Sequence, residues 1–225
     1  MTAERNPDLN AITSLSLHWP EYAMEFTEMA AYLLLTCTFA TLFQHPASPI
    51  HHLLSSSTVR RTCFGISIGV TIVAIVLTPW GKQSGGHFNP AMTFTFYRLR
   101  NVEFWDAIYY GVAQFAGAIA GVAIATRLLL GAPGNPAVRY AATLPGMYGA
   151  GVAFIAEVTI SFTLMVTVLF ASNHHVLSRY TPYLVGSLYA ALPFGFIFSH
   201  RLSACWPRRS SSCGHVTAWA RTAPN

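Results

Sequence analysis

Five long apolar segments constrain the fold of this chain more than any other feature. They run roughly over residues 23–43, 63–80, 107–130, 148–171 and 183–198. Each is near the roughly 20 residues that a helix needs to cross a bilayer core, although the second and the fifth are short. Because lipid cannot satisfy the backbone groups of an open sheet edge, the segments are expected to be helices. The sequence therefore predicts an all-α membrane protein with five membrane-spanning helices.

The composition agrees with this fold class. Hydrophobic residues make up 53% of the chain and charged residues 9%, against about 25% charged residues in a typical soluble domain. The net charge is +5, but the basic residues are scattered, so we expect a lipid bilayer and no nucleic acid as a partner. The four cysteines show no metal-ligand spacing, and we expect neither a cofactor nor enzymatic activity.

Small and ionisable residues mark the faces of these segments that are expected to pack. Gly65 with Gly69, and Gly117 with Gly121, have the spacing that lets two helices approach closely in lipid. An ionisable side chain at membrane depth costs free energy and is expected to face the protein interior. We expect the Glu157 side chain to face the protein interior, and the same expectation applies to Gln114. Glu25 and Glu28 lie near the start of their segment, so an interfacial position is the alternative for them.

A short apolar stretch at residues 91–97 follows a glycine-rich turn. Asn89 is a favoured helix cap and Pro90 is favoured at the first helical position. The stretch is only about seven residues long, which is too short to cross a bilayer. It is therefore predicted to be a half-helix that enters the membrane, which is tolerated only where protein or water covers its backbone. A solvent-facing loop with an ordinary cap is the alternative.

The chemistry of such an element suits a pore. The start of a half-helix carries a partial positive charge of about half a unit. Asn89 can offer an amide donor, and the backbone carbonyls of Gly85, Gly86 and His87 can offer acceptors. Donors and acceptors in a row suit neutral polar solutes, and the positive helix end repels cations.

The stretch SGGHFNPAMT, residues 84–93, resembles the first pore box of the aquaporin and glycerol-facilitator family. The resemblance covers roughly residues 20–195. It extends to Glu25 with Phe26, FGISIG at residues 64–69, Gln114 in AQFAGA and Glu157 in AEVTISF. In that family, six helices and two half-helices form a pore for water or glycerol, and four subunits assemble.

The resemblance implies a passive channel in the plasma membrane, a homotetramer, and water or small polyols as solutes. It implies that Asn89, Pro90 and Ala91 form one half of the pore junction, and that Glu25, Gln114 and Glu157 support the pore loops. The family's filter position on the second helix falls on Phe64 or Gly69, because TPWGKQ at residues 78–83 looks like a small insertion. Water and glycerol therefore both stay open as the solute.

A second Asn-Pro-Ala, at residues 135–137, is predicted not to be the partner box. It follows the third apolar segment, and Val138 precedes Arg139. In the family, the second box follows the fifth helix and has an arginine directly after the alanine. Residues 138–146 instead resemble the family's polar loop between helices three and four.

The first and fourth segments look alike, so the interval from Glu25 to Asn89 places the expected second box at residues 200–221. Residues 200–225 contain neither Asn-Pro-Ala nor a sixth apolar segment. We therefore divide the chain into a polar N-terminal segment (1–21), an incomplete aquaporin-like membrane domain (22–199) and an atypical basic tail (200–225).

The tail carries four arginines and no acid. On a topology with a cytoplasmic N-terminus, it would place eight basic residues outside against five inside, contrary to the positive-inside tendency. We expect a frameshift or truncation that begins between residues 192 and 200, with impaired folding and little channel activity. The alternatives are a genuine short family member and a non-conducting partner subunit in a mixed oligomer.

A membrane metalloprotein is a minor alternative. His51 with His52, and His174 with His175, are imidazole pairs, and imidazole is the commonest metal ligand. Both pairs are predicted to lie in loops, and no acid accompanies either.

Overall fold

The computed structural model describes residues 10–145 and 149–200 of the chain, and every regular element in these ranges is a helix. The five long helices are α1 (Ala11–Gln44), α3 (Ser57–Leu77), α6 (Phe104–Leu128), α7 (Gly149–Asn173) and α8 (Thr181–His200). The short elements are α2 (Pro49–Leu53), α4 (Pro79–Ser84), α5 (Pro90–Arg98) and the 3-10 turns η1 (Ala132–Gly134), η2 (Arg139–Ala141) and η3 (Ser178–Tyr180). The predicted all-α bundle is confirmed.

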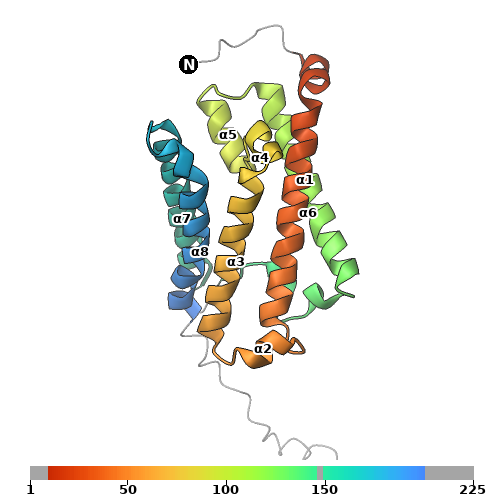
Figure 1. The fold of residues 1–225 in the computed structure, drawn as a ribbon, viewed down its shortest axis with the longest axis vertical. Coiled ribbons are helices and arrows are strands. Elements are labelled where there is room, and N and C mark those ends of the chain that lie inside the picture. The colour runs from red at the N-terminus through yellow and green to blue at the C-terminus, as the bar shows by residue number, and fades with distance from the viewer. Residues whose placement is uncertain (1–9, 146–148, 201–225) are drawn as a thin grey trace, which may run out of the picture.

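The long helices follow one another as neighbours in a bundle that is open on one side. Helix α6 packs along α1, α3 packs on the other side of α1, α8 packs on α3, and α7 packs chiefly on α8 (Figure 1). Four of them, α1, α3, α6 and α7, are long and apolar enough to cross a membrane by length and composition. Helix α8 coincides with the fifth apolar segment, and its 20 residues match the length of a crossing.

Helix α1 begins twelve residues earlier than the apolar segment that predicted it. Asn10 caps it, because its side chain accepts a hydrogen bond from the Thr13 N–H. Pro20 lies inside the helix, and the polar first turns are tied to α6, where the Tyr109 hydroxyl donates to the Ala11 carbonyl at 3.1 Å. Residues 11–21 are therefore continuous with the first membrane helix.

Glycines set the closest helix contacts. A Cβ on Gly117 or Gly121 of α6 would collide with the α1 backbone carbonyls of Phe26 and Ala30, respectively. On the other side of the bundle, a Cβ on Gly69 of α3 would collide with the carbonyl of Gly186 in α8. The glycine spacing in the sequence therefore marks real packing faces, where small residues let the backbones approach.

Candidate functional site

Helix α5 begins at Pro90, as predicted, and Asn89 caps it. The Asn89 side-chain oxygen accepts a hydrogen bond from the Ala91 N–H at 2.8 Å, and Pro90 occupies the first turn, where its missing N–H costs nothing. The Asn89 side chain is exposed, and its amide nitrogen has no hydrogen-bond partner among the described residues. The cap therefore uses the acceptor of this side chain and leaves its two N–H donors free.

The half-helix starts deep in the bundle and returns to the end from which the chain entered. Thr93, in the first turn of α5, is bonded to Gln114, which lies ten residues into α6, or about 15 Å along its axis. That is about half of a hydrocarbon core of about 30 Å. Residues 99–103 then lead directly into α6, so α5 does not cross (Figure 1).

The loop of residues 85–89, which we call the 85–89 loop, is held by the carboxylate of Glu25. This side chain is fully buried on α1. It accepts hydrogen bonds from the His87 N–H at 2.7 Å and the Phe88 N–H at 3.2 Å. Gln114 donates to it from α6 at 2.8 Å. Glu25 thus satisfies two backbone donors of an irregular segment that has no helix of its own to satisfy them.

Thr93 completes this network from the half-helix. Its hydroxyl accepts from the Gln114 amide at 3.1 Å and lies 3.0 Å from Nδ1 of His87. The His87 ring lies between aromatic rings, with centroids 5.0 Å from Phe96 and 5.1 Å from Tyr110. Three helices and the loop therefore meet at one buried hydrogen-bonded cluster.

A second set of contacts holds the residue before the loop. Ser84 is buried, and its hydroxyl lies 3.2 and 3.3 Å from the two carboxylate oxygens of Glu28. The Gly86 N–H donates to this hydroxyl at 3.1 Å, and the Tyr110 hydroxyl donates to the Ser84 carbonyl at 2.8 Å. Two of the three carboxylates of α1, Glu25 and Glu28, therefore face the loop in the protein interior.

The loop backbone needs left-handed conformations. Gly85 and Gly86 have φ angles of 90° and 56°, which glycine adopts without steric cost. Phe88 has a φ of 53°, unusual for a bulky residue, and its N–H is one of the two that Glu25 holds. Within the described residues, the carbonyl oxygens of Gly85, Gly86 and His87 accept no hydrogen bond, so the acceptors predicted for this loop are free.

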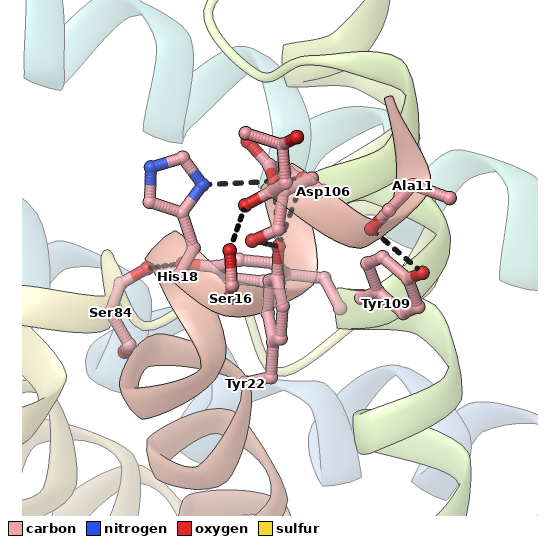
Figure 2. Close-up of polar contacts among 10 residues, drawn as sticks. Ala11, Ser16, His18, Tyr22, Ser84, Asp106 and Tyr109 are labelled. Atoms are coloured by element: carbon pink, nitrogen blue, oxygen red, sulfur yellow. Dashed lines mark hydrogen bonds and ion pairs between the residues drawn. The ribbon is translucent and has the colours of Figure 1, made fainter. Parts of the chain in front are cut away.

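A polar cluster around Asp106 fastens the start of α1 to the start of α6. One Asp106 oxygen accepts from the Tyr22 hydroxyl at 2.6 Å, lies 3.0 Å from His18 Nδ1, and is also bonded to the Ser14 hydroxyl (Figure 2). Asp106 lies in the first turn of α6, where the helix dipole favours a negative charge. A cavity of about 330 Å³ opens beside the cluster and reaches His87 and Ser84.

A larger cavity, of about 580 Å³, lies among α1, α3, α7, α8 and residues 136–144. Phe64, Arg61 and Glu157 lie on its wall. Of the two candidate filter residues, Phe64 therefore faces open space, whereas Gly69 is buried against α8. Glu157 is exposed and makes no hydrogen bond among the described residues, so its role in supporting a loop stays a prediction.

The second Asn-Pro-Ala has the same local bond in another setting. The Asn135 side chain accepts from the Ala137 N–H at 2.9 Å, as Asn89 does from Ala91. Two 3-10 turns flank it, and no half-helix follows in the described part of this loop, which ends at residue 145. Asn-Pro-Ala thus forms the same side-chain-to-backbone hydrogen bond in both places, and the residues that follow it determine whether a helix begins. The expected position of the partner box lies almost wholly in residues 201–225, outside the described residues.

The histidine pairs are not brought together. His51 and His52 lie on α2 rather than in a loop, and His51 donates from Nδ1 to the Phe43 carbonyl at 3.2 Å. His174 and His175 follow α7. Among the described residues, no group of three or more His, Cys, Asp or Glu side chains has a metal-binding arrangement.

Sequence reasoning missed three residues that hold the loop and its flanks, and one that joins α1 to α6. The first three are Ser84, Thr93 and Tyr110, and the fourth is Asp106. Helical spacing offered one signal, because Tyr110, Gln114 and Gly117 lie on a single face of α6.

Comparison with known proteins places this architecture in a family. A family model described as "Major intrinsic protein" matches residues 13–200. The chain belongs to the major intrinsic protein family, and the resemblance seen in its sequence is confirmed. With its membrane-length helices, the chain is a multi-pass integral membrane protein.

Individual relatives are similar over part of their length. "Aquaporin PIP-type" of Atriplex canescens is 37% identical over 58% of this chain and 44% of its own length. "Glycerol uptake facilitator protein-like 6" of Lactiplantibacillus plantarum is 36% identical over half of each chain. "Aquaporin PIP2-4" of Zea mays is 31% identical over 84% of this chain and 64% of its own length. The chain thus spans between about two fifths and two thirds of the length of these curated relatives.

Proposed function

We propose that this chain is a channel for the passive passage of water or small neutral solutes such as glycerol across the plasma membrane. The 85–89 loop carries the proposal. It lies at about half the depth of the bundle and is held from behind by Glu25. Within the described ranges, its carbonyl acceptors and the Asn89 amide donors have no partner. Free donors and acceptors beside a positive helix end replace the hydrogen bonds of a neutral solute and disfavour cations.

The relatives support the proposal by name, since they are called aquaporins and a glycerol uptake facilitator. They do not distinguish water from glycerol. Phe64 is the candidate filter residue, because its side chain lies on the wall of the large cavity. A homotetramer is part of the proposal, and an exposed apolar stripe on α6 that includes Val112, Phe115 and Ile119 supports contact with lipid or with neighbouring copies.

Osmotic flux into proteoliposomes tests the proposal, and the two Asn-Pro-Ala sequences provide a matched pair. Aspartate caps helices as well as asparagine does, so Asn89→Asp keeps the cap on Ala91 but removes the amide donors and adds a negative charge. Asn135→Asp makes the same change at residue 135, away from the 85–89 loop. Because the sequence predicts little channel activity, we expect the unmodified chain to pass water or glycerol slowly, though faster than empty vesicles do. We expect Asn89→Asp to lower that rate and Asn135→Asp to leave it unchanged.

The measurement is the rate of light-scattering change after an osmotic step, normalised to the amount of protein inserted. Circular dichroism of each variant confirms the helix content. Rates no higher than those of empty vesicles would contradict conduction by this chain and favour a partner-subunit role. Equal loss in both asparagine variants would contradict the assignment of Asn89 to the path.

A further inference from the structure

Helix α1 carries two buried carboxyl groups one turn apart, and their partners differ. Glu25 is 0% exposed and Glu28 is 3% exposed. Residues three apart on a helix lie on the same face, and both side chains face residues 84–88. Among the described residues, no Lys or Arg side chain forms an ion pair with either group.

Glu25 has the partners of an ionised carboxylate. Its three donors are the backbone N–H groups of His87 and Phe88 and the side-chain N–H of Gln114. None of these atoms can accept a hydrogen bond, so both Glu25 oxygens must act as acceptors. Several N–H donors stabilise the charged form of a carboxyl group.

Glu28 has different partners. Both of its oxygens share one hydroxyl, that of Ser84, at 3.2 and 3.3 Å. A single hydroxyl has only one proton to donate, so Ser84 offers Glu28 far less than the three N–H donors offer Glu25. The Ser84 hydroxyl also accepts from the Gly86 N–H and has a lone pair left to accept a second proton. With both carboxyl oxygens beside this one hydroxyl, a protonated Glu28 can accept from Ser84 through one oxygen and donate to its free lone pair through the other.

The charged and titratable groups around Glu28 do not offset a second negative charge. On α1, Glu25 lies one turn before it and Tyr32 one turn after it. The neighbouring segments present Tyr110 from α6 and His87 from the loop, while Lys82 on α4 is exposed. The charged residues of α3, Arg60 and Arg61, are its fourth and fifth residues, at the opposite end of that helix from α4.

We propose that Glu28 is held as a neutral carboxylic acid beside an ionised Glu25. Its proton then takes part in the hydrogen bonds through Ser84 that hold the 85–89 loop. Two carboxylates in one buried site repel each other, so one of the pair is expected to keep its proton. The Glu28 hydroxyl then donates to Ser84, and Ser84 accepts from Gly86. Glu28 is thus a positioning residue, and its protonation does not depend on whether the chain conducts.

Infrared spectroscopy of the chain in lipid tests this directly. We expect a C=O stretching band of a protonated, buried carboxyl group at neutral pH, and we expect Glu28→Gln to remove it. Amide hydrogen exchange provides the second readout, with the matched variants Glu28→Gln and Glu25→Gln. A glutamine at residue 28 can still donate to Ser84, so exchange at residues 86–88 should stay unchanged. A glutamine at residue 25 loses one acceptor oxygen, so exchange there should rise about tenfold.

A carboxyl band that survives in Glu28→Gln would overturn the proposal. So would a rise in exchange at residues 86–88 in Glu28→Gln as large as that in Glu25→Gln. The infrared comparison remains decisive if Glu25→Gln does not fold, because it needs only the unmodified chain and Glu28→Gln. Neither readout involves flux, so failure of this inference and failure of the proposed channel function are distinguishable.

Discussion

Thr93 joins the half-helix to the rest of the molecule through one hydroxyl. That hydroxyl contacts Gln114 and His87 in a buried site. Thr93→Val keeps the shape and removes both contacts, so we expect the free energy of unfolding to fall by about 1–3 kcal/mol. Thr95 is the matched control on the same helix, since its hydroxyl bonds only the Ala91 carbonyl of α5 itself.

The measurement for this pair is a denaturant titration of each variant in the same detergent. We expect Thr95→Val to unfold close to the unmodified chain and Thr93→Val to unfold clearly earlier. Equal midpoints for the two valine variants would contradict the role assigned to the Thr93 hydroxyl.

Glu25 and Gln114 could be predicted from the sequence because an ionisable or amide side chain in an apolar segment needs a partner. Ser84 and Thr93 could not. Hydroxyl side chains are common in membrane helices, where they bond the carbonyl one turn earlier, as Thr38 and Thr126 do here. The sequence does not distinguish a threonine that bonds to another helix from one that bonds to its own helix, because the difference depends on tertiary packing.

Helices α1 and α6 form a closely packed pair that holds the 85–89 loop from behind. Gly117 permits this approach, because a Cβ there would collide with the Phe26 carbonyl. We expect Gly117→Ala to destabilise the fold by about 1–3 kcal/mol through overpacking. Gly111, six residues earlier on α6, has nothing within 4 Å of the position that a Cβ would take, so Gly111→Ala is the matched control.

Thermal unfolding of the two alanine variants, followed by circular dichroism, measures the difference. Gly111→Ala should keep or slightly raise the midpoint, because alanine favours a helix by up to about 1 kcal/mol over glycine. A midpoint for Gly117→Ala at or above that of Gly111→Ala would show that the close α1–α6 contact does not exist.

At the scale of elements, the sequence predicts helices well where local signals agree. The cap at Asn89 and the proline after it predicted where α5 begins. Thr78 and Pro79 give α4 the same kind of start, since the Thr78 hydroxyl accepts from the Gly81 N–H. From the sequence alone, residues 78–83 look like a small insertion, and this helix is not predicted. The early start of α1 was missed because residues 11–21 are polar, and their helix depends on contacts with Asp106 and Tyr109 of α6.

The arrangement of the whole molecule follows from the family resemblance rather than from apolar pattern. Helix α7 is apolar almost all round, so its sequence does not say which face packs. In the structure it packs chiefly on α8, and Phe154, Phe162 and Phe170 are exposed. The large cavity beside it borders Phe64 and Glu157. The sequence predicts a pore role for each of these residues, but it does not predict that they line the same cavity.

The central claim at this scale is that residues 78–101 enter the membrane and leave it on the same side. Lys82 and Arg100 are exposed on the two flanks of this segment. Both flanks lie beside the first three turns of α1, because Gln83 donates to Glu21 at 3.1 Å and Arg100 lines the smaller cavity together with His18. Ser55 is exposed at the other end, between α2 and α3. A crossing α5 would place Lys82 and Arg100 on opposite sides.

The most direct measurement is labelling of single cysteines by a membrane-impermeant maleimide in vesicles of known orientation. The variants are Lys82→Cys, Arg100→Cys and the control Ser55→Cys, each in a background with the four native cysteines replaced by serine. We predict that Lys82→Cys and Arg100→Cys react from one side and Ser55→Cys from the other. Reaction of Lys82→Cys and Arg100→Cys from opposite sides would contradict the half-helix, and with it the assignment of Asn89 to a solute path.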